Sequence, residues 1–431
     1  MYFFYNVIIT LLFILLFPYL YLRSVFRGEG ILERMGILPK GAKRPLQSRK
    51  VIWFHSASVG EVRILPTIVP KLKKLLPEFS IVISTLTKTG KIEARKILPE
   101  ADLVFYAPVD IPLFVKKVIK KVNPFALILV ETELWPNLIK KAKEQKAFVA
   151  LINGRLSAKS FPKYLRFRSL FSLVLSFFDL LCMRTFEDAE RAEILWAKTE
   201  KIKIVGNLKF DQMIPHLNKY DKEAIRKDLG ISNSCQIIVA GSIREGEEKI
   251  ILNVFNRLKK ENPNLLLILA PRHLNQISLI EEYLLGLGLK FRKKTEIDKK
   301  SIEDQDYSVI LLNTIGELFS IYSIADVAFV GGSLVPLGGH NILEPAIWGV
   351  PVIFGLYIDD FKFAASCLIQ SGGGIMVENE DELYQSFSRL VKDEKLRKNL
   401  GEKGKEAVEK QRGAAEQTVR FLLEGLNRRF K

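Results

Sequence analysis

The chain has 431 residues, of which 48% are hydrophobic and 26% are charged, and its formal net charge is +17. This composition excludes a disordered chain, and the length predicts two domains because a single hydrophobic core seldom grows to that size. The three cysteines lie far apart and lack CxxC spacing, which excludes a disulfide framework and a zinc site and indicates a reducing compartment.

The first predicted element is an uncharged apolar segment, residues 1–22. As a helix it would span roughly 30 Å, the hydrocarbon thickness of a bilayer, and it lacks the basic start and the cleavage site of a signal peptide. We therefore expect a single-pass membrane anchor, with a buried core helix as the alternative. Basic residues follow the segment, which by the positive-inside rule places the remaining chain in the cytoplasm. They are Arg23, Arg27, Arg34, Lys40, Lys43, Arg44, Arg49 and Lys50.

Two basic clusters further along the chain indicate either a negatively charged partner or an ordinary solvated surface. An anionic membrane surface is the favoured partner, because each Lys or Arg near such a surface adds attraction. Nucleic acid is not expected, since zinc-finger, RNP-like and helix-turn-helix signals are missing from the sequence. The first cluster is Lys116, Lys117, Lys120 and Lys121, and the second is Lys163, Arg166 and Arg168, interleaved with Phe161, Tyr164, Phe167 and Phe171.

From Val51 onward, short apolar runs alternate with amphipathic stretches. This alternation predicts a parallel sheet with helices on both faces, an α/β doubly wound fold. The polar segment 213–222 interrupts the rhythm, which then resumes and closes in a charged helical tail. We expect one Rossmann-like domain over 23–212, a linker over 213–222, and a second Rossmann-like domain over 223–431 that includes the tail. Two such domains make the GT-B architecture, in which ligands lie at the carboxyl ends of the strands.

The segment HSASVGE, residues 55–61, directly follows the first strand of the pattern. Ser58 and Glu61 have the spacing of a capping box, so Glu61 could simply complete a helix N-terminus. Alternatively, Glu61 is a base that takes the proton from an attacking hydroxyl, since a carboxylate at such a turn is well placed to face a ligand. The residues alone leave both interpretations open. The helix N-terminus is expected to keep Glu61 ionised at neutral pH.

An acidic pair, Glu131 and Glu133, follows the apolar strand FALILV. The two side chains point to the same side if the chain remains extended. Such a pair can bind a divalent metal or position an acceptor, and a salt bridge to a neighbour is the structural alternative.

In the second half of the chain, Arg272 and His273 end the strand LLLILAP. A guanidinium suits phosphate because it offers a planar fork of donors. His273 and His55 could each be a donor or a packed side chain.

A glycine-rich turn, residues 331–340, joins a strand to a helix that we expect to begin at Asn341. Glycines let the backbone approach a ligand and a helix N-terminus attracts anions, so the turn predicts a phosphate site. Glu344 either completes a capping box with Asn341 or accepts hydrogen bonds from a ribose diol. The four glycines are Gly331, Gly332, Gly338 and Gly339.

Nine segments between about residues 50 and 360 resemble, in this order, those of the Kdo (3-deoxy-D-manno-octulosonic acid) transferases of lipopolysaccharide assembly, a GT-B glycosyltransferase family. The segments are HSASVGE, STLTKTG, ETELWPN, NGRLS, MRTFED, GNLKFD, GSIREGEE, APRH and FVGGSLVPLGGHNILEPAIWGVPVIFG. The resemblance implies an inverting transfer of Kdo from CMP-Kdo to a lipid A precursor at the cytoplasmic face of a Gram-negative inner membrane.

The resemblance also implies roles for individual residues. Glu61 would be the general base, Glu131 a second functional carboxylate, and Arg272 a contact of the donor phosphate. The CMP moiety would be held by the segment around the glycine-rich turn, and further residues would lie near the cleft. The donor-site residues are His273, Gly332, Ser333, Gly338, Gly339, His340, Asn341 and Glu344, and the cleft residues are Ser58, Gly60, Asn207 and Lys209.

No cofactor and no metal are expected, because CMP leaves as a phosphate monoester that cationic side chains can stabilise without a divalent ion. One alternative keeps the glycosyltransferase class but uses a UDP-sugar donor. Another is a membrane-anchored protein that binds nucleotide or RNA without catalysis.

Overall fold

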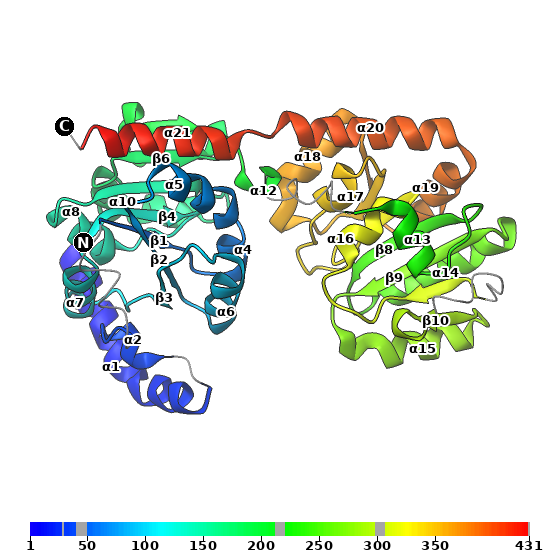
Figure 1. The fold of residues 1–431 in the computed structure, drawn as a ribbon, viewed down its shortest axis with the longest axis horizontal. Helices are drawn as coiled ribbons and strands as arrows, with labels where there is room; N and C mark the ends of the chain where they lie inside the picture. The colour runs from blue at the N-terminus through cyan, green and yellow to red at the C-terminus, as the bar shows by residue number, and fades with distance from the viewer. Residues whose placement is uncertain (28–29, 40–49, 212–219, 298–306, 430–431) are drawn as a thin grey trace. The chain divides into compact units, whose positions relative to one another are not determined.

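The computed structural model of the chain describes residues 1–27, 30–39, 50–211, 220–297 and 307–429. They form two units, Met1–Gln212 together with Arg412–Lys431, and Met213–Gln411. Each unit is an α/β domain around one parallel sheet, as the sequence predicts (Figure 1).

Unit 1 contains a seven-stranded sheet in the order β3-β2-β1-β4-β5-β6-β7, with every described pairing parallel. The order reverses beside β1, so the loops after β1 and β4 leave the sheet in neighbouring positions at its carboxyl edge, where doubly wound folds bind ligands. The strands are β1 Val51–His55, β2 Ser80–Thr85, β3 Leu103–Tyr106, β4 Pro124–Val130, β5 Phe148–Gly154, β6 Leu180–Met183 and β7 Ile202–Ile204.

Alternate residues of β1 face opposite sides of the sheet, as strand geometry requires. Val51 and Trp53 belong to the core on one face, and Ile52 and Phe54 to the core on the other. Both faces are therefore dry, which explains why the strands read as unbroken apolar runs. The helices of unit 1 are α1 Tyr2–Arg27, α2 Ile31–Arg34, α4 Val59–Val62, α5 Val69–Leu75, α6 Lys88–Ile97, α7 Pro112–Val122, α8 Pro136–Glu144, α9 Phe161–Arg166, α10 Arg168–Ser176, α11 Phe186–Ile194, α12 Leu208–Asp211 and α21 Ala414–Asn427.

The C-terminal helix α21 packs on unit 1, so the prediction that the whole tail completes the second domain is wrong for residues 412–431. Val419 and Leu422 are buried in the same core as Ile52. The Asp211 carboxylate accepts the N–H groups of Gly413 and Ala415 at 2.9 and 2.7 Å and so caps the helix. Sequence position alone cannot reveal this return, because the partners of α21 lie about 200 or more residues earlier in the chain.

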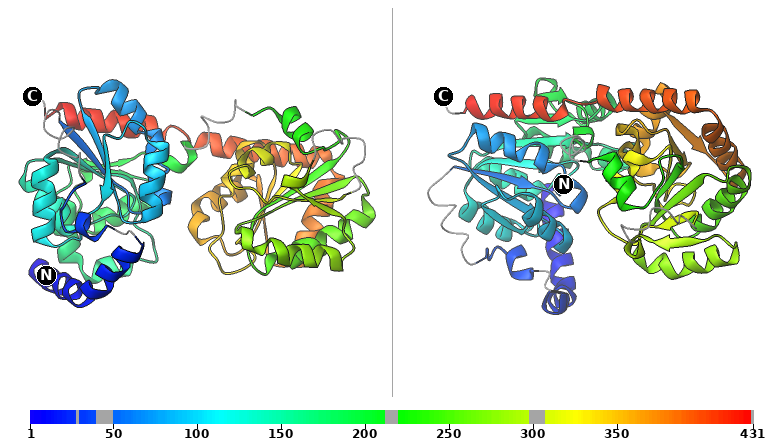
Figure 2. Two further views of the ribbon diagram at one scale, coloured as in Figure 1. Left: turned by 60° about the horizontal axis from the view of Figure 1, so that its bottom comes forward. Right: turned by 45° about the vertical axis from the view of Figure 1, so that its right-hand side comes forward.

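Unit 2 repeats the design with the strand order β10-β11-β9-β8-β12-β13-β14, again with parallel pairings. Figure 2 shows the ribbon of each unit in two further views. Most of the predicted linker lies outside the described residues, and Asp221 at its end caps α13. The strands are β8 Gln236–Ile243, β9 Leu265–Pro271, β10 Phe291–Lys293, β11 Val309–Leu311, β12 Val327–Val330, β13 Val352–Gly355 and β14 Gly374–Val377. The helices are α13 Lys222–Asp228, α14 Glu247–Glu261, α15 Ile277–Gly286, α16 Leu318–Ile321, α17 Leu343–Ile347, α18 Lys362–Ser371, α19 Glu380–Lys392 and α20 Glu394–Lys410.

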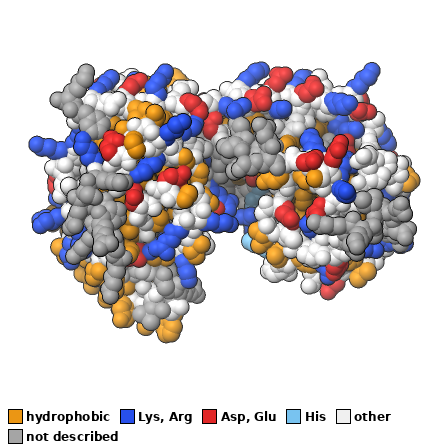
Figure 3. All heavy atoms as spheres, in the orientation of Figure 1, with side chains coloured by type: hydrophobic (Ala, Val, Ile, Leu, Met, Phe, Trp, Pro, Cys, Tyr) orange, Lys and Arg blue, Asp and Glu red, His pale blue; other side chains and the backbone are white. Residues whose placement is uncertain are grey.

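The N-terminal helix α1 is long and apolar enough over Tyr2–Leu22 to cross a membrane, by length and composition. Hydrophobic side chains gather where α1 lies on unit 1 (Figure 3). The beginning of α1 is nevertheless bonded to unit 1, because the Tyr5 hydroxyl donates to Asp110 at 2.8 Å and Asn137 donates to Asn6 at 2.7 Å.

The end of α1 is also close to unit 1. The Ile31 N–H of α2 donates to Ser24 near the end of α1, and Glu33 of α2 accepts the Tyr106 N–H and an ion pair from Lys91. Both ends of the helix therefore contact the same unit.

Candidate active site

Glu61 lies at the start of α4, directly beyond the carboxyl end of β1, and only 8% of its surface is exposed. Its carboxylate accepts the Ala57 N–H at 2.7 Å and the Ser58 hydroxyl at 2.9 Å, and Ser58 in turn accepts the Glu61 N–H at 3.4 Å. Ser58 therefore caps α4, as predicted, but the second half of a capping box is missing, because the Glu61 carboxylate accepts the N–H of Ala57 and not that of Ser58. Ser58 and Gly60 are exposed beside it.

The N-terminus of α4 does not keep Glu61 ionised. Burial raises the pKa of Glu61 to about 8, and the charges of Glu133 and Glu131 add to the effect, while the bonds from Ala57 and Ser58 oppose it. The prediction that the helix N-terminus holds this carboxylate ionised is therefore wrong, because α4 is a single turn and desolvation outweighs its donors. A carboxyl with a pKa near neutral is suited to proton transfer.

Glu133 connects the two acidic segments of the sequence. Its carboxylate accepts the Trp135 indole N–H at 2.6 Å and lies 3.6 Å from Nε2 of His55. His55 is fully buried, and its Nδ1 lies 2.9 Å from the Ser84 hydroxyl, which accepts a bond from Trp53. Because Trp53 can only donate, the Ser84 proton is available to Nδ1, which leaves Nε2 as the protonated nitrogen that faces Glu133.

Glu131 has different partners from Glu133. The chain leaves its extended path at Glu131, which has a left-handed φ of 61°, so the condition for the predicted same-side arrangement is not met. The Glu131 carboxylate instead pairs with Lys209 at 3.1 Å and accepts a long bond of 3.4 Å from Asn153. Asn207 is buried two residues before Lys209 and accepts its N–H. The structure thus brings Glu131, Asn207 and Lys209 together in unit 1.

Arg184, after β6, is a residue that the sequence reasoning did not select. It is 9% exposed, and its Nε and Nη1 atoms have no hydrogen-bond partner among the described residues. Burial lowers the pKa of its guanidinium, and the Glu131 charge raises it in compensation. A buried guanidinium with free donors is suited to an anionic group of a ligand. The signal in the sequence was its position at a strand end, in the segment MRTFED.

In unit 2, the backbone of the glycine-rich turn is held by a residue that the sequence reasoning also left aside, Glu247. This fully buried carboxylate accepts the N–H groups of Gly332, Ser333 and Leu334 at 2.6, 3.0 and 2.9 Å, and that of Arg244 at 2.9 Å. The turn has the form of an anion-binding concavity, and the protein fills it with its own carboxylate. The phosphate site predicted for these N–H groups is therefore occupied by Glu247.

Ser333 is likewise committed to the fold. It is fully buried, and its hydroxyl donates to the Val330 carbonyl at 2.6 Å and accepts the Gly355 N–H at 2.8 Å. Gly338 and Gly339 have left-handed φ angles of 84° and 75°, and Gly339 donates to the Gly332 carbonyl. These residues shape the turn.

Cationic and imidazole side chains gather beside the same turn, at the carboxyl ends of β8, β9 and β12. Nη1 of Arg244 lies 3.3 Å from Nε2 of His273. Burial lowers the pKa of His340 to about 4, and the nearby Arg272, Arg244 and His273 add to the effect. We call these four residues, Arg244, Arg272, His273 and His340, the basic cluster. Its His340 is neutral, and its arginines offer positive charge to an anion.

The start of α17 differs in detail from the predicted capping box. The helix begins at Leu343, whose N–H donates to the Asn341 side chain at 3.3 Å. The Asn341 amide in turn donates to the Glu344 carboxylate at 3.2 Å. Glu344 therefore contacts the side chain of Asn341, and a contact with ribose stays a prediction.

Within the described residues, no group of three His, Cys, Asp or Glu side chains has an arrangement that could hold a metal ion. Metal independence stays a prediction.

Sequence comparisons identify a family and individual relatives. A family described as 3-Deoxy-D-manno-octulosonic-acid transferase (kdotransferase) matches residues 29–212. The chain is 32% identical over 405 residues to a 3-deoxy-D-manno-octulosonic acid transferase of Haemophilus influenzae, covering 93% of this chain and 92% of that protein. It is also 36% identical over 347 residues to a bifunctional glycosyltransferase/methyltransferase of Fusobacterium nucleatum, covering 80% of this chain but only 53% of that protein.

Solved structures support the two-domain fold. A UDP-GlcNAc 2-epimerase from Neisseria meningitidis matches with a TM-score of 0.61 over 87% of this chain and all of that one, at 16% identity. At this identity the likeness concerns the fold alone.

Proposed function

The chain belongs to the Kdo transferase family of GT-B glycosyltransferases, and from that premise we propose that it transfers Kdo from CMP-Kdo to a lipid A precursor with inversion at the anomeric carbon. The observation that carries the proposal is Glu61, a buried carboxyl at the carboxyl end of β1 whose pKa is raised to about 8. The chemistry needs one proton acceptor in that range.

In the proposed reaction, Glu61 takes the proton from an acceptor hydroxyl as its oxygen forms a bond to the anomeric carbon. The bond between that carbon and the CMP phosphate oxygen breaks on the opposite side, and CMP leaves with the electron pair. Glu133 tunes Glu61 through its charge, and His55 lies beside Glu133; neither residue receives the proton. Glu131 with Lys209 is proposed to hold the acceptor.

The basic cluster of unit 2 is proposed as the donor site. Arg272 and Arg244 would stabilise the charge that develops on the CMP phosphate, which is the largest electrostatic demand of the step. Because Glu247 occupies the N–H groups of the glycine-rich turn, the phosphate is assigned to these side chains rather than to the turn. Asn341 and Glu344 are proposed to reach the ribose.

For localisation we propose that α1 anchors the protein at the cytoplasmic face of the inner membrane. The basic residues after α1 support a location on the cytoplasmic side, and the exposed apolar face of α1 supports contact with the membrane. The sequence predicts one complete crossing, whereas the bonds of both ends of α1 to unit 1 favour a helix that lies within the interface.

The test is to mix the purified protein with CMP-Kdo and a tetra-acylated lipid A precursor and to measure the product mass. We expect products that are heavier by whole Kdo units. Transfer from a UDP-sugar instead, with stabilisation against heat by UDP and not by CMP, would replace the donor assignment.

The role of Glu61 is tested by Glu61→Gln, since glutamine keeps an acceptor for Ala57 and a donor for Ser58. We expect a loss of transfer of roughly 10²- to 10⁴-fold with an unchanged fold. The matched control is Glu144→Gln, which removes an exposed carboxylate paired with Lys141 and should leave the rate unchanged. Parental activity in a folded Glu61→Gln would remove the catalytic assignment.

A further inference from the structure

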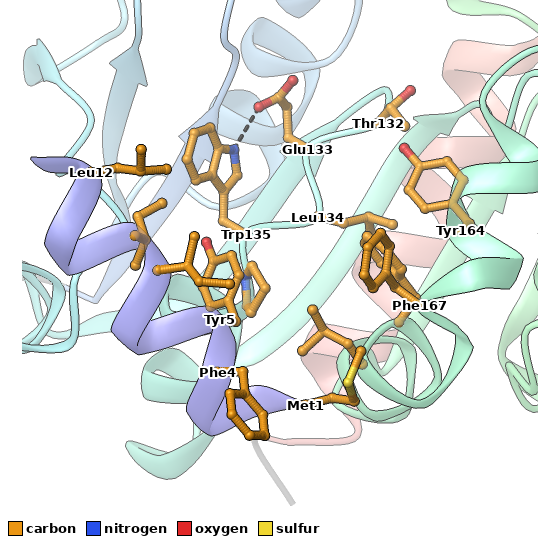
Figure 4. Close-up of a pocket in the computed structure, with 15 residues that line it drawn as sticks. Met1, Phe4, Tyr5, Leu12, Thr132, Glu133, Leu134, Trp135, Tyr164 and Phe167 are labelled. Atoms are coloured by element: carbon orange, nitrogen blue, oxygen red, sulfur yellow. Dashed lines mark hydrogen bonds between the residues drawn. The ribbon is translucent and has the colours of Figure 1, made fainter.

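A pocket of about 570 Å³ opens in unit 1 between α1 and the helix pair α9 and α10 (Figure 4). This is within the range of roughly 300–1,000 Å³ that small-molecule sites occupy. Three stretches line it: the first half of α1, the loop from Thr132 to Pro136, and α9–α10. From α1 and α9–α10 the lining side chains are Met1, Phe4, Tyr5, Ile8, Ile9, Leu12, Tyr164, Phe167, Leu170 and Phe171.

The pocket has an apolar body and one polar end. Its walls are aliphatic and aromatic, and its two lining residues that are polar without being aromatic, Thr132 and Glu133, lie on the loop after β4. Glu133 is also the carboxylate that lies beside His55 and raises the pKa of Glu61. One end of an apolar pocket is therefore part of the candidate active site.

The wall that α1 provides is fixed in place. The hydroxyl of Tyr5 donates to the buried Asp110, and the rings of Phe13 and Phe114 lie 5.3 Å apart at their centroids. Along the lining from Met1 to Leu12, the helix rises about 16 Å at 1.5 Å per residue. The pocket is thus long enough for an extended chain, and not only for a compact group.

The surroundings match a membrane lipid. On α1, Phe3, Leu11 and Leu15 are exposed and do not line the pocket, so this helix offers an apolar surface to a bilayer as well as to the pocket. On α9, Lys163 and Arg166 are exposed on either side of the pocket residue Tyr164 and can meet phosphate groups at the rim. A ligand that matches both features has an apolar chain and an anionic head group.

We propose that this pocket binds one acyl chain of the acceptor lipid while the head group of the same lipid lies at Glu133 and Glu61. The inference rests on the proposed function and adds to it a site that selects the acceptor by its chain. The pocket joins the active site at one end, and its α1 wall also faces the membrane, so an acyl chain can pass from the bilayer along α1 without exposure to water. A polypeptide segment fits less well, because its backbone N–H and C=O groups would meet too few partners in these walls.

The test compares Ile8→Trp, which fills the pocket, with Leu11→Trp, which puts the same side chain on the exposed face of α1. The readout is the ratio of kcat/KM for a tetra-acylated acceptor to kcat/KM for its deacylated counterpart. We expect Ile8→Trp to lower this ratio at least about tenfold, because each methylene kept out of the pocket loses burial energy. Leu11→Trp should leave the ratio unchanged. An equal effect of both variants, or no effect of Ile8→Trp, would overturn the pocket assignment, whereas no transfer at all by the parent chain would overturn the proposed function.

A direct measurement does not depend on turnover. A dodecyl phosphate with a diazirine at the end of its chain is irradiated with the full-length protein in detergent, and the labelled residues are mapped by mass spectrometry. We expect label on Ile8, Leu12 and Phe171, and less of it in Ile8→Trp. Label confined to Phe3, Leu11 and Leu15 would show contact with bulk detergent or lipid only and would contradict the proposal.

Discussion

Glu133 Oε2 lies 3.6 Å from Nε2 of His55, and the same carboxylate raises the pKa of Glu61. The two residues come from separate segments, because His55 ends β1 and Glu133 follows β4. The His55 imidazole is held by Ser84 through Nδ1, which leaves Nε2 facing Glu133. The candidate base is therefore tuned by a neighbour that does not itself carry the proton.

This relationship predicts the pH dependence of transfer. The base form of Glu61 is the carboxylate, so kcat/KM should increase with pH and level off above about 8, the pKa of Glu61 in the free protein. Glu133→Gln removes a negative charge, which should lower the pKa of Glu61 and move the rise to lower pH. Glu144→Gln is the control and should leave the profile in place. A profile that does not respond to Glu133→Gln would contradict the coupling.

Stability should change with pH through the same residue. The folded-state pKa of Glu61 is about 8 against an ordinary value of 4.5, so folding favours its protonated form. Its contribution is complete below about pH 4.5 and is lost as the pH rises through about 8. Glu61→Gln has no proton to lose there. Its Tm relative to the parent chain should therefore increase between pH 5 and pH 8.5, measured by thermal unfolding at several pH values. A difference in Tm that is constant with pH would show that the pKa is not raised.

The fold and the positions of the site could be predicted from sequence because both follow from local patterns. Unbroken apolar runs between amphipathic stretches determine buried parallel strands, and polar residues directly after those runs must lie at the carboxyl edge. Glu61 and Arg272 were found in this way.

Orientation could not be predicted in the same way. Glu131 was expected to align with Glu133 only if the chain stayed extended, and the left-handed φ of Glu131, which a single non-glycine residue does not reliably signal, breaks that condition; Glu131 pairs with Lys209. Glu247 was set aside because its partners are the backbone N–H groups of residues 85 to 87 positions later, which no local pattern contains. The return of α21 to unit 1 is non-local in the same sense.

Glu247 should be essential for the shape of the glycine-rich turn. In Glu247→Gln, the amide NH2 would replace one of the two carboxylate oxygens that accept the backbone N–H groups. Each buried donor left without an acceptor costs about 1–3 kcal/mol. We expect a clear loss in Tm together with weaker binding of CMP, followed by calorimetry. Glu245→Gln, an exposed neighbour, is the control and should be neutral. Unchanged stability of Glu247→Gln would mean that the turn does not depend on this carboxylate.

The basic cluster predicts how CMP binding responds to mutation and salt. Arg272→Gln removes a charge-assisted contact worth about 1.5–3 kcal/mol, so CMP affinity should fall roughly 10- to 100-fold. The dependence of the remaining affinity on salt should also be weaker, because fewer charges meet the phosphate. Arg257→Gln is the matched control, since this arginine pairs with Asp381 on the surface of the same unit. Equal losses in both variants would indicate a general effect of charge instead of a site.

The bonds of α1 predict its topology in the membrane. Tyr5 and Asn6 near its beginning and Ser24 near its end all contact unit 1 or the helix bound to it, so both ends should lie on the side of the membrane that holds the catalytic body. A helix that crossed the bilayer would have to give up the Tyr5–Asp110 bond and leave a buried carboxyl without one of its donors. A cysteine added before Met1, in a chain with Cys235→Ser and Cys367→Ser, should react with an impermeant maleimide in inside-out vesicles and not in intact spheroplasts. Glu424→Cys on α21 marks the side of the body. Labelling of the added cysteine from the outside of spheroplasts would show instead that α1 crosses the membrane and that its contacts with unit 1 do not persist in a bilayer.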